Sequence, residues 1–375
     1  MTPPATRIHA LDGLRGLLAL YVAVYHLAAP LTHAGMALAP IRILLEPAWF
    51  AVDMFFVMSG FVMAHVYAAS FGPGADPEAT WRFFVARIAR LYPVHLFALA
   101  VMAAGILPAF HDRPEFTDPD GRFAWTAALA SLAMLHGPWI DHRTWNYPAW
   151  SISAEWHAYL LFPMLAPLLA KLRSAGRLRI VALGVLLPFV LYQFELADET
   201  HPTNGLLLLM RVLPLFAAGA AAHGLRDAAW ARSDTVALLA FAGTPLLLLG
   251  PGTSAAAVLL APCVLLAAVG HPLVRRFLSR AWLLRLGAIS YSLYMTHALV
   301  EMGVVNVALR GFKRHAGIDI AQAPAASTVL LIAATLVALG VGAFTWRWVE
   351  LPGRRLIGTI ALRRPQPATR QPSTP

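Results

Sequence analysis

Long apolar segments, separated by short arginine-rich connections, make up most of this chain and restrict it to one broad structural class. Of its 375 residues, 59% are hydrophobic and only 13% are charged. A soluble globular protein carries about 25% charged residues. A helix needs about 20 apolar residues to cross the hydrocarbon core of a bilayer. We therefore predict an all-α, polytopic membrane protein with the lipid bilayer as its first partner.

Ten segments have a usable length for a membrane span. Proline or glycine interrupts several of them, which bundled helices tolerate because neighbouring helices satisfy the freed backbone groups. A further apolar segment, about 123–141, is ambiguous. No segment outside the membrane is long enough for another domain, so we expect one membrane-embedded domain over residues 8–357. The ten predicted spans lie at about 11–30, 46–68, 91–110, 150–170, 180–196, 206–224, 234–250, 255–271, 285–309 and 325–349.

The basic residues orient these segments, because cytoplasmic loops carry an excess of Lys and Arg. With both termini in the cytoplasm and 123–141 at the surface or re-entrant, most basic blocks lie on the cytoplasmic side. If 123–141 spanned, every later block would change sides. The formal net charge of +10 therefore reflects membrane topology, and we expect no nucleic-acid partner. Residues 358–375 are basic and proline-rich, and are predicted to form a disordered cytoplasmic tail.

Arg15 and His26 are ionisable residues inside the first apolar segment, where such residues are costly and usually functional. Eleven residues correspond to about three helical turns, so both side chains share one face, about 16 Å apart along the axis. A neutral imidazole is the usual general base near pH 7. The alternatives are a histidine bonded to a backbone carbonyl or water, and an Arg15 that simply pairs with Asp12. The separation is too large for Arg15 to orient His26, so any shared role requires a long anionic substrate.

Arg87 and Arg90 lie three residues apart in an amphipathic cytoplasmic segment that we expect to end at Pro93. Two guanidinium groups on one helix face suit phosphate groups. The alternative is that both extend toward lipid head groups at the interface.

Polar residues near the predicted outer ends of the second and fourth spans are the next candidates. Glu155 is placed near the depth of His26, where a carboxylate could orient the imidazole or hold an acceptor hydroxyl. Asp53 lies at a comparable depth. Trp150 fits either a site or an interfacial aromatic belt. For Ser59 and the following glycine, a small-residue packing notch is the favoured interpretation.

His297 lies in the middle of the ninth predicted span, where a histidine needs a polar partner or a wet cavity. Glu301, four residues later, is a possible partner on the same face. Glu350, close to several arginines, is expected to form an exposed ion-pair cluster. The lone Cys263 excludes an internal disulfide, and the fourteen histidines are scattered, so we expect no metal site.

Taken in order, these segments resemble the acyltransferase-3 family of membrane enzymes. The resemblance rests on six ordered blocks that cover roughly residues 8–357: Leu-Asp-Gly-Leu-Arg-Gly from Leu11 with His26 after it; Val-Asp-Met-Phe-Phe-Val-Met-Ser-Gly-Phe from Val52; Arg-x-x-Arg-Leu-Tyr-Pro from Arg87; Trp-Ser-Ile-Ser-x-Glu from Trp150; Ile-Ser-Tyr-Ser-Leu-Tyr from Ile289 with His297; and Val-Glu-x-Pro from Val349. The last block departs from the family pattern, since a leucine precedes its proline where a basic residue is expected.

The resemblance implies an enzyme of the cytoplasmic membrane that transfers an acyl group, typically acetyl, from acyl-coenzyme A to a hydroxyl of a carbohydrate or glycolipid acceptor. No permanently bound cofactor is implied. His26 and Arg15 correspond to an essential pair, and Arg87 and Arg90 to an arginine pair that contacts the donor phosphates. Transfer is expected to be direct, with an acyl-His26 relay as a variant. Asp12, Asp53, Ser59, Trp150 and His297 are expected to support the site, and Glu155 to act with His26.

A transporter or flippase is the alternative from another class, with Arg15, His26 and His297 as a proton or substrate path. Transporters often consist of repeated halves, and the sequence contains no detectable internal repeat.

Overall fold

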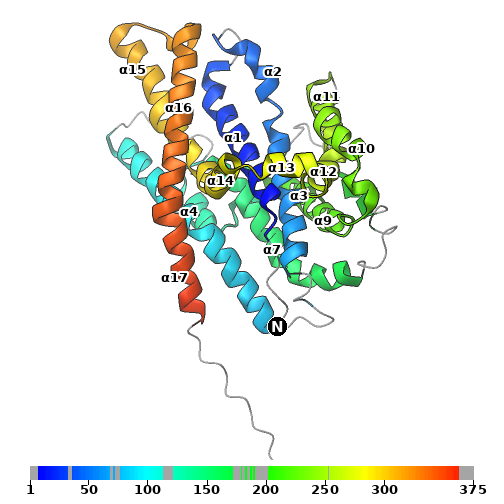
Figure 1. Ribbon diagram of the computed structural model, residues 1–375. Helices are drawn as coiled ribbons and strands as arrows, with labels where there is room; N and C mark the ends of the chain where they lie inside the picture. Colours follow the sequence, from blue (N-terminus) through cyan, green and yellow to red (C-terminus); the bar gives the residue numbers. More distant parts are fainter. Residues whose placement is uncertain are drawn as a thin grey trace, which may run out of the picture.

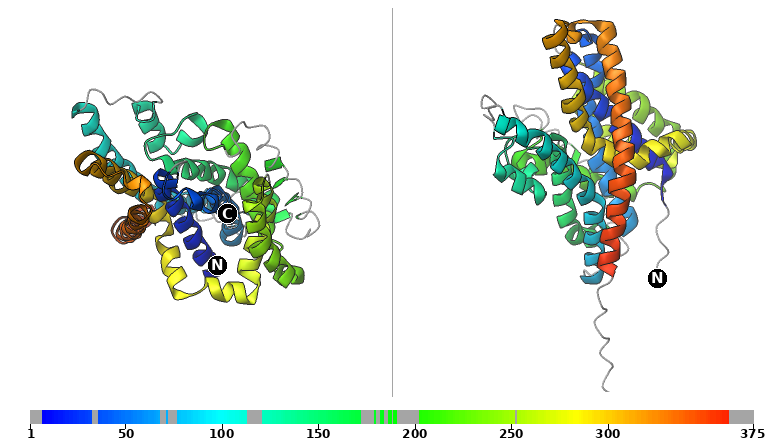
Figure 2. Two further views of the ribbon diagram at one scale, coloured as in Figure 1. Left: turned by 90° about the horizontal axis from the view of Figure 1, so that it is seen from above. Right: turned by 90° about the vertical axis from the view of Figure 1, so that its left-hand side faces the viewer.

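Helices form all the regular structure of the described part of the chain. The computed structural model describes residues 7–32, 36–67, 71, 77–112, 121–171, 179, 182–183, 186–187, 189–190, 202–251 and 253–362. The predicted all-α class is confirmed over these residues. They form a tall central bundle with a lateral group of shorter helices (Figures 1 and 2).

Six helical segments are long and apolar enough to cross a bilayer, or seven if one bent helix pair counts as a span. They are α1 (His9–Thr32); Ala39–Tyr67, which contains the short α2 (Arg42–Leu45) and α3 (Ala48–Tyr67); Pro77–Gly105 within α4 (Pro77–Asp112); α9 (Gly205–His223); Ala281–Ala316, which joins α14 (Ala281–Val300) to α15 (Asn306–Ala316); and Pro324–Ile360, which joins α16 (Pro324–Thr345) to α17 (Leu351–Leu362). The bent pair consists of Ser254–Gly270 and Pro272–Leu278, which meet at an angle of 83°. The first segment contains α12 (Ala261–Gly270), and the second is α13.

The remaining predicted spans are matched only in part. α7 (Trp150–Lys171) coincides with the predicted span at 150–170. The segment Asp234–Leu249, with α10 (Asp234–Leu238) and α11 (Thr244–Leu249), is apolar but shorter than a full span. Most of the predicted span at 180–196 lies outside the described residues. The ambiguous segment 123–141 forms two short helices, α5 (Trp125–Leu132) and α6 (His136–Trp139), neither long enough to cross a bilayer.

The predicted helix end at Pro93 is wrong, because α4 continues through it as a single helix. The proline ring packs against α17, where a Cβ added to Gly353 would lie 2.5 Å from Pro93 Cβ. Neighbouring helices in a bundle compensate for the backbone hydrogen bond that proline removes. As a result, Arg87 and Arg90 lie on the same continuous helix as the candidate membrane span Pro77–Gly105.

Glycines bring the backbones of α1 and α14 into direct contact. A Cβ added to Gly16 would lie 2.6 Å from the amide nitrogen of Gly287, and one added to Gly287 would lie 2.1 Å from the carbonyl oxygen of Asp12. Small residues allow this approach between membrane helices. His26 of α1 and His297 of α14, which follow these glycines in their helices, also lie side by side. The two helices α1 and α14 therefore run in the same direction.

The helices α3 and α9 meet in the same way. A Cβ on Gly60 would lie 1.8 Å from the carbonyl oxygen of Phe216, and one on Gly219 would lie 1.7 Å from that of Val57. The small-residue packing notch predicted for Ser59 and Gly60 is thereby confirmed at Gly60, whereas Ser59 lines the cavity described below. The first turn of α1 and the last turn of α17 point toward the same end of the bundle (Figure 1).

Candidate active site

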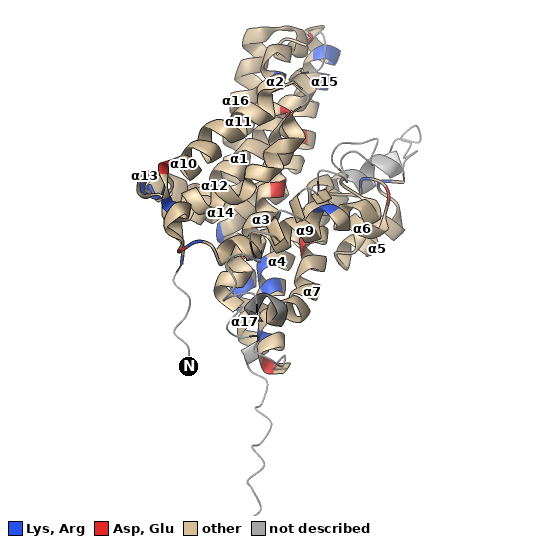
Figure 3. Cartoon of the chain, turned by 90° about the vertical axis from the view of Figure 1, so that its right-hand side faces the viewer, with Lys and Arg blue, Asp and Glu red and all other residues tan. Residues whose placement is uncertain are grey.

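A cavity of about 550 Å³ opens between α1, α3, α4, α7, α14 and α17. Backbone positions occupied by Lys or Arg gather near α4 and α17 (Figure 3). Two carboxylates, Asp12 and Glu155, are the acidic residues of its lining. The cationic residues of the lining are Arg7, Arg15, Arg87, Arg90 and Arg354. The described lining is therefore strongly cationic and suited to a polyanion.

Asp12 holds two arginines on one wall of this cavity. Its carboxylate accepts a hydrogen bond from Nε of Arg7 at 2.6 Å and lies 3.6 Å from Nη1 of Arg15. The pairing of Asp12 with Arg15, which the sequence left open as an alternative, is present. Because Arg15 also lines the cavity, its ion pair does not remove it from a binding role.

Arg87 and Arg90 line the cavity from α4, as neighbours on one helix face. Arg87 donates a hydrogen bond to the Tyr67 hydroxyl at 3.0 Å, and its guanidinium carbon lies 5.5 Å from the centre of the Tyr159 ring. Arg90 lies 5.0 Å from the centre of the Tyr291 ring. Contacts of this kind stabilise cations beside aromatic rings, and both arginines have such partners within the protein.

The prediction that Glu350 belongs to an exposed ion-pair cluster is wrong, because its side chain is fully buried. It does form ion pairs, with Arg90 of α4 and with Arg354 one turn later in the chain. The hydroxyl of Ser292 on α14 donates a third hydrogen bond at 2.8 Å. The packing of α17 against α4 and α14 creates this enclosure, which no local sequence pattern predicts.

Glu155 lies in the cavity and not against the His26 imidazole. Its carboxylate accepts a hydrogen bond from the Tyr159 hydroxyl, which also lies 3.0 Å from Ser59 Oγ. Two of the predicted site residues, Glu155 and Ser59, are therefore connected through Tyr159. The hypothesis that Glu155 orients the imidazole is wrong in this structure, because the orienting group is a backbone carbonyl.

That carbonyl belongs to Val22, whose oxygen lies 2.9 Å from Nδ1 of His26. A carbonyl oxygen can only accept, so the neutral ring carries its proton on Nδ1, and Nε2 keeps the basic lone pair. The backbone carbonyl that the sequence left open as an alternative partner of His26 is therefore present, and the lone pair of the neutral ring lies on Nε2.

His26, which is half-buried, and His297 form the centre of a cluster of aromatic rings. Their ring centres are 4.8 Å apart, and the Tyr147 ring lies 5.1 Å from His26 and 5.9 Å from His297. His297 is fully buried. The structure therefore brings together two predicted site residues that are far apart in the sequence.

Tyr294 connects the cavity with the histidines. It lines the cavity, and its ring centre lies 5.7 Å from that of His297. Its hydroxyl lies 2.7 Å from Ser151 Oγ. Tyr294 was not among the candidate residues predicted from the sequence, although Tyr291, Tyr294 and His297 recur at three-residue spacing and so share one helix face.

Glu301 does not serve His297 as the sequence spacing suggested. It accepts a hydrogen bond from the Tyr147 hydroxyl. Burial and the neighbouring Glu301 carboxylate raise the pKa of Tyr147 well above its usual value, so the hydroxyl stays protonated and acts as the donor. A π-helical turn, Glu301–Val305, begins at this residue.

Asp53 and Trp150 meet Arg211 and do not line the cavity. The Asp53 carboxylate and Nε of Arg211 are 2.8 Å apart in a fully buried ion pair. The Arg211 guanidinium carbon lies 5.7 Å from the centre of the Trp150 ring. These two predicted supporting residues therefore stabilise the packing of α3, α7 and α9 beside the site.

Comparison with known proteins gives a consistent assignment. A family model described as an acyltransferase domain matches residues 8–345. The chain is 30% identical to "Acyltransferase MdmB" of Streptomyces mycarofaciens over 404 aligned positions, which cover 100% of this chain and 98% of that protein. It is 33% identical to "Protein 2 in picA locus" of Rhizobium radiobacter over 164 positions, which cover 42% of this chain and 78% of that protein. No solved structure matches the chain. The family match includes Arg15, His26 and His297, and it ends before Glu350 and Arg354.

Proposed function

This chain belongs to the acyltransferase family whose model matches residues 8–345, and on that premise we propose that it transfers an acyl group, typically acetyl, from acyl-coenzyme A to a hydroxyl of a carbohydrate or glycolipid acceptor. One observation carries the proposal. A cavity lined by five arginines adjoins, through Tyr294, the pair formed by the half-buried His26 and the buried His297.

The arginine-lined cavity supports a polyanionic donor. Coenzyme A carries three phosphate groups, and guanidinium groups bind phosphate through paired, charge-assisted hydrogen bonds. In our proposal Arg87 and Arg90 hold phosphates of the nucleotide, and Arg15 lies along the path of the pantetheine arm. Glu155 offsets part of the positive charge and, through Tyr159, fixes the wall opposite α1.

His26 is the proposed general base. Its Nε2 removes the proton of the acceptor hydroxyl as that oxygen attacks the thioester carbonyl. The tetrahedral intermediate then collapses, the carbon–sulfur bond breaks, and His26 returns the proton to the departing coenzyme A thiolate. The Val22 carbonyl keeps Nδ1 protonated throughout. His297 packs against the imidazole and restricts its orientation.

For the topology we propose ten spans in a cytoplasmic membrane, with both termini and the donor cavity on the cytoplasmic side. The common direction of α1 and α14 supports this, because the first and ninth spans must cross in the same sense. α7 and the segment Asp234–Leu249 supply candidates for two of the further spans. The arginines of the cavity agree with the positive-inside rule. The acceptor then approaches the histidines from the opposite side.

Transfer of labelled acetyl groups tests the proposal. Inside-out membrane vesicles from cells that express the chain would receive acetyl-coenzyme A labelled in the acetyl group, and label in the carbohydrate and lipid fractions would be measured. We expect His26→Ala to lower the transfer rate at least a hundredfold, the range for general acid–base catalysis, without loss of folded protein. His315→Ala, in an exposed residue of α15, is the matched control and should leave transfer unchanged.

Two results would contradict the proposal. If His26→Ala transferred acetyl groups near the wild-type rate, His26 would not be the general base. Wild-type vesicles that leave the thioester intact but move a solute across the membrane would favour the transporter alternative.

A further inference from the structure

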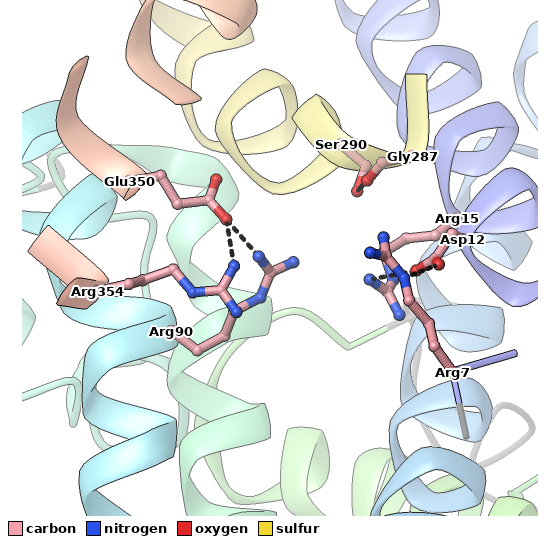
Figure 4. Close-up of polar contacts among 8 residues, drawn as sticks. All are labelled: Arg7, Asp12, Arg15, Arg90, Gly287, Ser290, Glu350 and Arg354. Atoms are coloured by element: carbon pink, nitrogen blue, oxygen red, sulfur yellow. Dashed lines mark hydrogen bonds and ion pairs between the residues drawn. The ribbon is translucent and has the colours of Figure 1, made fainter. Parts of the chain in front are cut away.

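Two carboxylates, each bound to a pair of arginines, face one another across the cavity. On one wall Asp12 binds Arg7 and Arg15. On the other wall Glu350 binds Arg90 and Arg354. Figure 4 shows the two groups on opposite sides, with Gly287 and Ser290 of α14 above the space between them. The second group is formed partly by residues beyond the family match.

Glu350 has the bonding pattern of a residue that fixes other side chains. It is fully buried, and its two oxygens receive hydrogen bonds from Arg90, Arg354 and Ser292. A buried carboxylate is tolerated only when such partners compensate for the lost hydration. It is the last residue of a π-helical turn, Trp346–Glu350, a type of distortion that is frequent at functional sites.

Arg90 is held from two sides as a consequence. Its Nη1 bonds to Glu350, and its guanidinium lies over the Tyr291 ring. The Tyr291 hydroxyl is itself anchored to the carbonyl oxygen of Leu91. A flexible arginine side chain is thereby reduced to one orientation while it still lines the cavity. Such preorganisation lowers the entropy lost when a ligand binds.

Arg354 completes this arm of the cavity. It lines the cavity, lies 3.4 Å from Glu350, and has a side chain that is 43% exposed. It can therefore move to meet a ligand, whereas Arg90 is already in place. Neither Glu350 nor Arg354 touches the histidine cluster in the described structure.

We propose that Glu350 is a positioning residue that orients Arg90 and Arg354 as a phosphate-binding arm for the nucleotide end of the donor, across the cavity from Arg7 and Arg15. This inference rests on the proposed function, because it concerns the same donor site. It adds two residues to that site and gives them different roles: Arg354 contacts the phosphates, and Glu350 acts only through the two arginines.

A comparison of two donors tests the inference. Acetyl-coenzyme A carries the nucleotide phosphates, whereas acetyl-pantetheine presents the same thioester without them. In the vesicle transfer assay, we expect Glu350→Gln to raise the KM for acetyl-coenzyme A about tenfold, the size of one charge-assisted hydrogen bond, with little change in kcat. The KM for acetyl-pantetheine should not change. A general loss of structure would affect both donors alike.

Arg354→Gln provides a second route, since it leaves the buried pair of Arg90 and Glu350 intact and avoids an unpaired buried charge. It should raise the KM for acetyl-coenzyme A several-fold and spare acetyl-pantetheine. Glu78→Gln is the matched control, because Glu78 forms an exposed ion pair with Arg82 on the same helix as Arg90. It should change neither KM.

The outcomes separate the two proposals. If wild-type vesicles transfer acetyl from acetyl-coenzyme A but Glu350→Gln and Arg354→Gln affect both donors equally, the inference fails and the proposed function stands. A lower KM for acetyl-coenzyme A in Glu350→Gln would mean that Glu350 merely neutralises the charge of the arginines. That result would also overturn the inference. If wild-type vesicles transfer nothing from acetyl-coenzyme A, both proposals fail.

Discussion

His26 and His297 each lie ten residues after a glycine at which α1 and α14 touch, and their rings meet 4.8 Å apart. Gly16 and Gly287 bring the two backbones together. Because both helices rise about 1.5 Å per residue and run in the same direction, side chains ten residues farther along reach the same height. The glycine contact thus sets the register that pairs the histidines.

This register predicts a kinetic role for His297. His297→Gln removes the ring that packs against His26 but keeps a polar side chain of similar length. We expect kcat for acetyl transfer to fall at least tenfold, because the base loses its fixed orientation, while the KM for acetyl-coenzyme A stays the same. Steady-state transfer rates in vesicles would measure both. A variant with unchanged kcat and a raised KM would instead assign His297 to donor binding.

The buried pair of Asp53 and Arg211 predicts a change in stability that is independent of the active site. Asp53→Asn breaks the buried ion pair between Asp53 and Arg211. Removing one member of a buried ion pair costs about 3–5 kcal/mol. The double variant Asp53→Leu with Arg211→Met removes both charges and should regain a substantial part of this loss. Thermal unfolding of the detergent-purified protein would compare the variants. A double variant no more stable than Asp53→Asn would show that packing, and not charge pairing, dominates there.

The contact between α3 and α9 predicts a steric effect at Gly60. Gly60→Ala introduces a Cβ only 1.8 Å from the Phe216 carbonyl oxygen, so the helices must separate. Overpacking of this kind costs about 1–3 kcal/mol. We expect a lower midpoint of thermal unfolding and less folded protein.

Gly340→Ala is the matched control for that substitution. Gly340 lies in α16, and an added Cβ would have no heavy atom within 4 Å among its described surroundings. Its unfolding midpoint should equal that of the wild type. Equal destabilisation by both substitutions would contradict the close approach of α3 and α9.

Features that depend on a single helix could be predicted from the sequence. Hydropathy identified the apolar helices, and the arrangement of charges predicted that 123–141 is not a full span. The three-residue spacings predicted that Asp12 meets Arg15 and that Arg87 and Arg90 share a face. These predictions agree with the structure because residues three or four positions apart are neighbours on any helix.

Partners on different helices could not be predicted in this way. Glu155 was expected beside His26 and lies with Tyr159 in the cavity. Asp53 was expected at a depth comparable with that of His26, and it pairs with Arg211. The sequence indicates how deep a residue lies in the membrane, but not which way its helix faces. Two residues at equal depth can therefore point into different parts of the bundle.

The sequence alone determined that this protein is a helical membrane protein, that it resembles a family of acyltransferases, and that Arg15, His26 and the arginine pair of α4 are its candidate residues. The tertiary structure decided how these residues combine. It paired His26 with His297, placed Tyr294 between them and the cavity, and buried Glu350 against Arg90. The physical reason is that charge and hydropathy act along the chain, whereas the rotation and register of each helix are set by close contacts such as that of Gly16 with Gly287.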